Sequence, residues 1–436
     1  MSSRGEIVTA PVPQRTLWGS VRSLRASRHS RVLSGSIIML VGSAFVSLMN
    51  FGYNVAVARL LGPAGFSHAA AAVTLLMLVS CVNLAYQLVT AKLIAKAEDP
   101  AERAGIYTAV LKRSWTIGLA VGVGLALASE PLAAYLRFPS VNLLLILAAG
   151  MVFYIPLGAK RGGMQGTCKF ERLATNLGFE AVMKLIVAVA LVWFGLGVVG
   201  AVAGISVSVI VAYFLPADDK ELRTAPLPGM RAPFREALQA IIFFVGQVII
   251  NNVDILLVKH YFTAQQAGLY AAIALVGRLL YFASWSVTSA MFPVSAGEKV
   301  EEDSRRVLVV PLMFVTVISI LFVALLAVVP QLVIQVLFGP GFHFPNLDIE
   351  GLLTMNAVAM GVYALSVVLI TYEISRRIAN TAWLQLLVSG LVIAGVVTFH
   401  ASLMQVIVVQ QVLRTLLLIA VSAPFFRQPH ALQEAV

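Results

Sequence analysis

The side chain with the most specific chemistry in this sequence is Arg278, which stands inside an apolar stretch at about 265–294. A charge near the centre of a bilayer costs about 2.5–3.5 kcal/mol on insertion scales, so such a residue faces protein or water rather than lipid. A guanidinium group matches phosphate oxygens and binds them through two parallel hydrogen bonds. Arg278 is therefore a candidate phosphate ligand; the alternative is an ion pair between helices, with Asp254 as its partner.

Two acidic residues, Asp254 and Glu180, also lie inside apolar stretches. A carboxylate within a membrane can take up H⁺ or Na⁺, which makes both residues candidates for coupling transport to an ion gradient. We expect Asp254 to be the coupling residue. Each has a structural alternative: Asp254 as the partner of Arg278, and Glu180 as the partner of Lys184, four residues later on the same helix face. Arg414, in the last stretch, is expected to pair with a neighbour or to line a crevice.

These charges belong to a chain made almost entirely of apolar stretches. It is 59% hydrophobic and 12% charged, with a mean hydropathy of +0.90, whereas soluble domains are about a quarter charged. Backbone amides find no water inside lipid, and long continuous runs favour helices over the strands of a barrel. We predict an all-α integral membrane protein whose twelve transmembrane helices lie at about 34–58, 66–90, 114–129, 140–159, 174–194, 197–215, 236–258, 265–294, 307–329, 349–372, 380–399 and 402–424.

The 31 Lys and Arg residues fall almost entirely in every second gap between these stretches. The remaining gaps hold Arg59, Arg137 and Lys259, and the stretches themselves hold Lys184, Arg278 and Arg414. Basic loops stay on the cytoplasmic side of a membrane. We therefore expect a multi-pass protein of the cytoplasmic (inner) membrane with both termini in the cytoplasm. The net charge of +11 then indicates contact with anionic lipids and not with nucleic acid.

The chain divides into two similar halves of six helices each. The sequence Asn50-Phe-Gly-Tyr-Asn54 precedes the end of the first span, and Asn251-Asn-Val-Asp254 precedes the end of the seventh. An even number of spans per half makes the repeat parallel, with a ligand handled between the halves. The predicted units are a basic cytoplasmic tail (1–32), which is disordered or lies on the membrane surface, an N-terminal six-helix bundle (33–216), a Pro-rich cytoplasmic linker (217–233), a C-terminal six-helix bundle (234–427) and a cytoplasmic tail (428–436).

Several motifs resemble those of polysaccharide flippases, a branch of the multidrug/oligosaccharidyl-lipid/polysaccharide superfamily. They are the Asn-rich first span, Ala58-Arg-Leu-Leu-Gly-Pro-Ala-Gly-Phe66, the basic loop at 160–173, Ala267-Gly-Leu-Tyr-Ala271 and Met291-Phe-Pro-Val294. The resemblance extends over about 33–426, with Ser67-His68 as a departure from the family pattern. It implies a V of two six-helix bundles that alternate between inward-open and outward-open states. The implied cargo is a polyprenyl-pyrophosphate-linked oligosaccharide, moved to the outer leaflet for surface polysaccharide biosynthesis.

This resemblance gives the polar residues of the spans specific roles. Arg278 is expected to bind the pyrophosphate of the cargo. Arg59 and Lys259 occupy matching ends of the first and seventh spans, where they would receive phosphate late in the cycle, although snorkelling of long side chains explains them equally well. Amides that could bind sugar hydroxyls, or could serve ordinary helix–helix hydrogen bonds, are supplied by Asn50, Asn54 and Asn251.

Two other functional classes share parts of the pattern. A multidrug and toxin extrusion antiporter has the same twelve-helix plan but favours an acidic cavity, whereas the candidate residues here are mixed to basic. A membrane-embedded glycosyltransferase or ligase needs large outer loops, and the longest one, 338–350, carries Asp348 and Glu350. The sequence has no nucleotide-binding, nucleophile or metal-ligand motif. We expect a transporter without catalytic residues, metal or cofactor apart from H⁺ or Na⁺, whose partners are membrane lipids and the polymerase and glycosyltransferases of its pathway.

Overall fold

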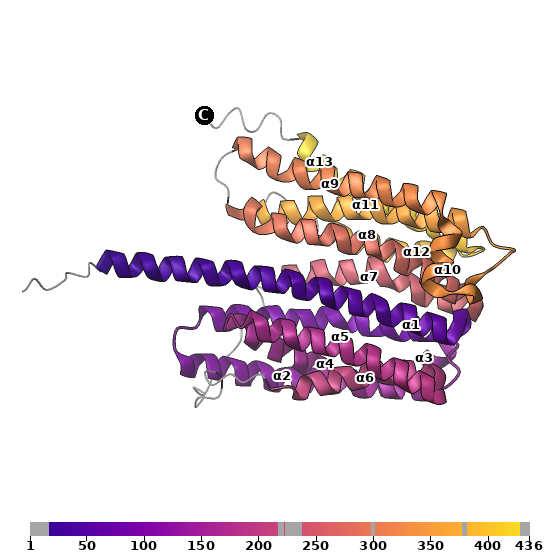
Figure 1. Ribbon diagram of the computed structural model, residues 1–436, viewed down its shortest axis with the longest axis horizontal. Helices are drawn as coiled ribbons and strands as arrows, with labels where there is room; N and C mark the ends of the chain where they lie inside the picture. The colour runs from indigo at the N-terminus through magenta and orange to yellow at the C-terminus, as the bar shows by residue number, and fades with distance from the viewer. Residues whose placement is uncertain (1–16, 217–221, 223–237, 298–300, 377–381, 428–436) are drawn as a thin grey trace, which may run out of the picture.

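The computed structural model describes residues 17–216, 222, 238–297, 301–376 and 382–427. Long helices that run roughly parallel to one another make up most of this described part (Figure 1). They are α1 (Leu17–Lys96), α2 (Pro100–Leu127), α4 (Asn142–Gly166), α5 (Phe170–Leu191), α6 (Gly197–Phe214), α7 (Leu238–Tyr261), α8 (Ala264–Gly297), α9 (Glu301–Val328), α11 (Ile349–Arg376), α12 (Ala382–Thr398) and α13 (Leu403–Arg427).

The predicted count of twelve membrane spans is consistent with these helices. Within the described residues, eight segments are long and apolar enough to cross a membrane. Two of them, Ile38–Lys96 with 59 residues and Phe170–Phe214 with 45, each have the length of two crossings. The 24-residue α7 and the shorter apolar helix α12 complete the set. The all-α membrane architecture expected from the sequence is therefore confirmed.

Glycines divide both of the double-length segments. Gly62 interrupts α1 with a φ of 66°, in the left-handed region that favours glycine, and Pro63 follows it. The chain turns back at this point, so α1 contains the first and second spans (Figure 1). Between α5 and α6, a π-helical turn at Val192–Leu196 contains Gly195 with a φ of 88°. The turn predicted after the first span is thus a sharp reversal at Gly62, where one helix ends and the next begins without a longer loop.

Three features differ from the expected layout or fall outside it. Helix α1 begins at Leu17, so the second half of the tail predicted as disordered or surface-bound is helical and continuous with the first span. Two short helices were not predicted, α3 (Ser129–Tyr135) and α10 (Pro330–Phe338), and a 3₁₀ turn (Pro340–Phe342) follows the second. The rest of the predicted tail (1–16), the linker except Leu222, and the C-terminal tail (428–436) lie outside the described residues.

The two halves meet through α1. It packs against α4 and α5 of its own half and against α7 and α8 of the other half (Figure 1). Below, "the α10 end" is the end of the molecule that carries α3 and α10. "The basic end" is the opposite one, where α1 finishes at Lys96 and α2 begins at Pro100. These two ends allow each polar cluster to be placed along the direction of the spans.

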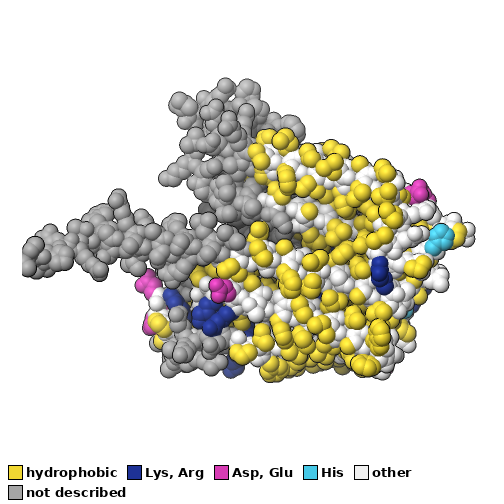
Figure 2. All heavy atoms as spheres, in the orientation of Figure 1, with side chains coloured by type: hydrophobic (Ala, Val, Ile, Leu, Met, Phe, Trp, Pro, Cys, Tyr) yellow, Lys and Arg dark blue, Asp and Glu magenta, His cyan; other side chains and the backbone are white. Residues whose placement is uncertain are grey.

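Apolar side chains cover the middle of the molecule. Figure 2 shows hydrophobic side chains over most of the described surface, with Lys and Arg gathered mainly toward the basic end. Large residues such as Trp193 and Val328 are each 79% exposed. A soluble protein rarely exposes so much contiguous apolar surface, whereas lipid solvates it. The fold and its surface describe a multi-pass membrane protein.

Candidate functional site

A chain of buried hydrogen bonds joins three helices of the second half at Asp254. This residue of α7 is 1% exposed, and its Oδ2 accepts a hydrogen bond of 2.7 Å from the Tyr270 hydroxyl of α8. The Tyr270 oxygen in turn accepts a 2.6 Å bond from Gln410 Nε2 of α13. Asp254 Oδ1 has no partner among the described residues. The carboxylate therefore keeps one acceptor for water or an ion, because a buried acceptor left unpaired is costly.

Two guanidinium groups hold the neighbouring turn of α7. Arg278 Nη2 of α8 donates to Asn251 O at 2.6 Å, and Arg414 Nη2 of α13 donates to Ile250 O at 3.1 Å. The two groups thus sit on carbonyls of consecutive residues. Arg414 is fully buried beneath the Tyr363 ring, with its Cζ 5.7 Å from the ring centroid, whereas Arg278 is half-buried. Of the two, Arg278 is the one that a large ligand can reach.

The structure brings Asp254, Arg278 and Asn251 into one network, which we call the C-half network together with Tyr270 and Arg414. Neither oxygen of Asp254 bonds to a guanidinium group among the described residues. The interaction of Asp254 with both arginines is therefore electrostatic and acts over a longer range than an ion pair. The side-chain amide of Asn251 donates within α7, and its Oδ1 has no partner in the described part of the chain.

A second polar cluster surrounds Glu180 in the first half. Glu180 Oε2 lies 2.5 Å from Arg161 Nη2, and Arg161 Nε donates to Asn176 Oδ1 at 2.8 Å. Lys184, the partner predicted for Glu180, instead donates to Asn50 Oδ1 of α1. The expected pair within one helix is thus replaced by contacts between helices. Asn50 is already used in this way, and its main-chain oxygen also accepts a bond from Asn54, four residues later.

Arg161 is a residue of this cluster that sequence reasoning missed. The sequence predicts a cytoplasmic loop at this position, but α4 continues to Gly166 and leaves Arg161 only 4% exposed. The sequence signal that could have revealed it is the spacing of two small residues, Gly158 and Gly162, on one face of the helix. A Cβ on Gly158 or Gly162 would lie 2.4 Å from a main-chain oxygen of α1, so these glycines allow α4 to pack closely there.

The predicted outer-face cations join the two halves at the α10 end. Arg59 Nε donates to Leu337 O at 2.8 Å, and its Nη2 donates to Val336 O, so Arg59 of α1 holds the last turn of α10. Lys259 of α7 is 2% exposed and donates to Ser67 Oγ at 2.7 Å. Both side chains are occupied in this conformation. The buried Lys259 must lose its bond to Ser67 before it can meet a ligand, whereas Arg59 is exposed.

Apolar contacts close the same end of the molecule. The ring of Phe66 lies 6.3 Å from that of Phe338 and 6.2 Å from that of Phe342, measured between centroids. Gly268 at the start of α8 packs directly on the α1 kink, where a Cβ would fall 1.8 Å from Pro63 O. These contacts and the two cation bonds all connect the first half to the second. We call them together the α10-end contacts.

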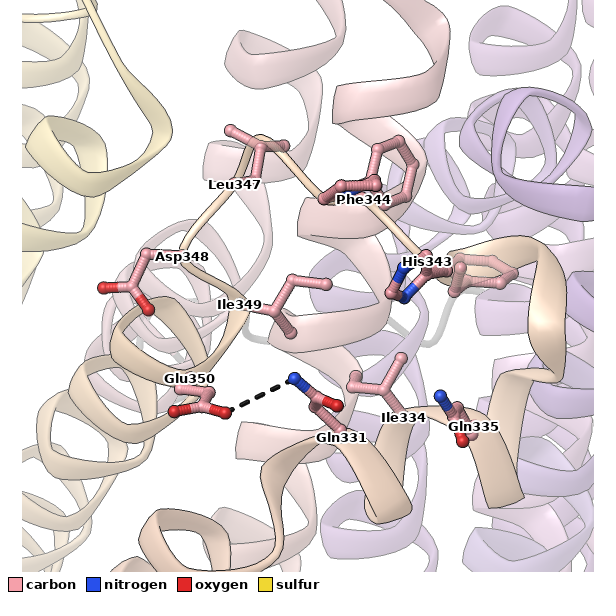
Figure 3. Close-up of a pocket in the computed structure, with 11 residues that line it drawn as sticks. Gln331, Ile334, Gln335, His343, Phe344, Leu347, Asp348, Ile349 and Glu350 are labelled. Carbon is pink, nitrogen blue, oxygen red and sulfur yellow. Dashed lines mark hydrogen bonds between the residues drawn. The ribbon is translucent and has the colours of Figure 1, made fainter.

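A pocket of about 280 Å³ opens between α10 and the start of α11 (Figure 3). It contains Asp348 and Glu350, the acidic residues considered for an enzyme. Asp348 Oδ1 accepts a hydrogen bond from Gly351 N at 2.9 Å and so caps α11, and Glu350 Oε1 accepts a long bond of 3.4 Å from Gln331 Nε2. Both carboxylates are exposed, and Figure 3 shows them on one side of the pocket, away from His343.

Comparison with known families identifies the chain. The model of the family described as "polysaccharide biosynthesis protein" matches residues 56–343, which include Arg59, Glu180, Asp254 and Arg278. The chain belongs to the polysaccharide biosynthesis protein family. No curated protein matches the chain.

The solved structures that resemble this member of the family include MATE transporters. A multidrug resistance MATE family transporter of the MOP superfamily in an inward-facing conformation has a TM-score of 0.67 and 16% identity, covering 88% of this chain and 96% of its own. An outward-facing one has a TM-score of 0.55 and 14% identity, covering 91% and 95%. A Vibrio cholerae MATE transporter has a TM-score of 0.62 and 15% identity, covering 94% and 98%. At these identities the similarity establishes a shared fold.

Proposed function

We propose that this protein is a flippase that moves a polyprenyl-pyrophosphate-linked oligosaccharide across the cytoplasmic membrane for surface polysaccharide biosynthesis. The observation that carries the proposal is Arg278, a half-buried guanidinium midway along α8 in a chain of the polysaccharide biosynthesis family. Helix α8 packs against α1 of the other half, so Arg278 belongs to the helix pair that must separate if the halves rock. A cationic group at that depth suits a pyrophosphate that has to leave the headgroup region.

The same geometry supports alternating access with the α10 end closed. The bonds of Arg59 and Lys259, the phenylalanine cluster and the Gly268–Pro63 contact all seal that end. The chain is also more similar to the inward-facing than to the outward-facing MATE structure. We assign the α10 end to the outside, so that cargo enters from the cytoplasm. When the α10 end opens, Arg59 and Lys259 are released and become available to the phosphate groups of the cargo.

A drug antiporter and a glycosyltransferase fit these features less well. The MATE similarity concerns the fold. The guanidinium groups of Arg278 and Arg414 share one carboxylate, Asp254, and this net positive charge would repel a cationic drug. The hydrogen bond from Gly351 N to Asp348 supports a role of this residue as a helix cap rather than as a catalytic acid. The proposed partners are the lipid-linked glycan, membrane lipids, and the glycosyltransferases and polymerase that act before and after transport.

The proposal is tested with the purified protein in lipid vesicles. A polyprenyl-pyrophosphate oligosaccharide is placed in one leaflet, and its arrival in the other is measured with a glycosidase that cannot cross the membrane. We expect cargo to become accessible much faster than in protein-free vesicles. Movement of a cationic dye in place of the glycan would instead assign the protein to the drug antiporters.

Coupling to an ion gradient is proposed for one of the two predicted carboxylates. Glu180 is the better candidate on exposure: although it is ion-paired with Arg161, its side chain remains 15% exposed, whereas Asp254, which keeps one unpaired oxygen, is only 1% exposed. In the same vesicles, we expect flipping to accelerate when a pH or Na⁺ gradient is imposed. Glu180→Gln should remove this acceleration while cargo binding persists. Loss in Asp254→Asn alone would move the coupling site to the second half, and no response in the parent protein would exclude coupling.

The orientation is tested by topology. With the basic end in the cytoplasm, both termini are cytoplasmic, as the distribution of Lys and Arg predicts. Reporter fusions should read outside at Gly62, Phe138 and Phe342, and inside at Asp99, Gly166 and Glu302. A reversed reading at two of these positions would contradict the orientation.

A further inference from the structure

The C-half network carries more positive than negative charge. Its two guanidinium groups, Arg278 and Arg414, share electrostatic contact with one carboxylate, Asp254. Tyr270 of the network is neutral, and so is Tyr363, whose ring lies over Arg414. The network therefore holds one excess positive charge among helices α7, α8 and α13. Burying a charge without a counter-charge costs several kcal/mol even after the protein relaxes, so this excess calls for a partner.

The same guanidinium groups have unused hydrogen-bond donors. Arg278 Nε, Arg414 Nε and Arg414 Nη1 are buried and have no partner among the described residues. Arg414 itself is fully buried, so bulk water cannot serve these donors. Each guanidinium group donates one hydrogen bond to α7, Arg278 to Asn251 O and Arg414 to Ile250 O. These two bonds keep the groups next to each other. Unpaired donors and excess charge thus coincide in one place.

We propose that Arg414 and Arg278 bind a small monovalent anion of about the size of chloride inside the second half. One negative charge balances the excess of one, and a single ion can accept hydrogen bonds from both groups. A water molecule would satisfy the donors but leave the charge. A phosphate group attached to a lipid is too bulky to reach Arg414, which has no exposed surface. The proposed anion is therefore distinct from the cargo, and it does not depend on the proposed transport function.

If the network binds an anion, removal of the charge of Asp254 and removal of the charge of Arg414 should have opposite effects on anion binding. Removing the charge of Asp254 raises the excess to two and should strengthen anion binding. Replacing Arg414 by a neutral residue removes the excess positive charge and two of the three unpaired hydrogen-bond donors. A site built for Na⁺ around the free Asp254 oxygen would give the reverse pattern, because Asp254→Asn would then remove binding.

The test is the thermal stability of the purified full-length protein in detergent. Gluconate is replaced stepwise by chloride at constant ionic strength, with sodium and then with potassium as the cation, and unfolding is followed by tryptophan fluorescence. A ligand that binds the folded state raises the midpoint. We expect a saturable rise of several degrees that is the same for both cations. In Asp254→Asn the half-saturating chloride concentration should fall about tenfold, and in Arg414→Gln the rise should disappear.

Two further variants keep the test decisive. Lys184→Gln removes a buried cation of the first half that already has Asn50 as its partner, and it should leave the chloride response unchanged. If Arg414→Gln does not fold, Arg414→Lys keeps the charge but loses the fork of donors, and should weaken the response. A parent protein indifferent to chloride, or one stabilised by sodium in a manner that Asp254→Asn removes, would overturn the proposal.

Discussion

Replacement of Arg278 by alanine should reduce glycan export at least about tenfold while the protein remains inserted in the membrane. Hydrogen bonds to charged groups contribute about 1.5–3 kcal/mol, and a pyrophosphate group can accept two from one guanidinium group. Arg278 Nη2 now bonds to Asn251 O, so a phosphate that binds the two Nη groups would take over this bond by exchange. Lysine offers charge without the fork, and Arg278→Lys should therefore retain only part of the export.

Stability and export must be measured together for these variants. Arg278→Ala also removes the bond to α7, so the membrane-inserted amount and the thermal midpoint are recorded beside surface glycan. Arg113→Ala, on the exposed face of α2, is the matched control and should leave export unchanged. Normal export by Arg278→Ala would show that Arg278 serves packing, and the phosphate assignment would then be wrong.

The spans were predictable because lipid leaves the backbone no alternative to helices. A run of about 20 apolar residues between charged gaps locates the apolar part of each helix, and for α11 it also gives the bounds to within a few residues. The polar ends are not found in this way, since α2 begins at Pro100 and α4 continues to Gly166. The short helices α3 and α10 escaped because seven and nine residues are too few to cross a membrane. They lie between spans, and tertiary contacts such as that of Arg59 with the last turn of α10 help to fix them. The sequence of Pro330–Phe338 contains no pattern that predicts this contact.

The polar sites were predictable in part for the same physical reason. A charge within an apolar run is expensive, which singled out Asp254, Arg278 and Glu180 from the sequence alone. Their partners could not be found in this way. Gln410 reaches Tyr270 across 140 positions of sequence, and Arg161 reaches Glu180 from a position that resembled a loop. Uncharged residues such as Gln410 are common in spans, and only the packing of the helices decides which of them meet.

The closed α10 end gives the second large effect, at Gly268. A Cβ on this glycine would lie 1.8 Å from Pro63 O and 2.5 Å from Pro63 C, both main-chain atoms that a side-chain rotation cannot move. Excess volume in a packed contact costs about 1–3 kcal/mol. Gly268→Ala should therefore disfavour the conformation with this end closed. Since about 1.4 kcal/mol changes an equilibrium tenfold, the population should shift by about 10- to 100-fold toward the opened α10 end.

The measurement uses a cysteine that this contact hides. Ser67 is 1% exposed and belongs to the α10-end contacts as the acceptor for Lys259. Ser67→Cys, in a chain whose Cys81 and Cys168 are replaced by serine, keeps a weak acceptor there and should react slowly with a thiol reagent that cannot cross the membrane. Gly268→Ala should accelerate the labelling and reduce export, because a transporter held open on one side cannot complete its cycle. Gly124→Ala is the control, since a Cβ there meets no atom within 4 Å. Unchanged labelling in Gly268→Ala would mean that the Gly268–Pro63 contact does not keep the α10 end closed. Accelerated labelling with normal export would mean that closing the α10 end is not required for transport.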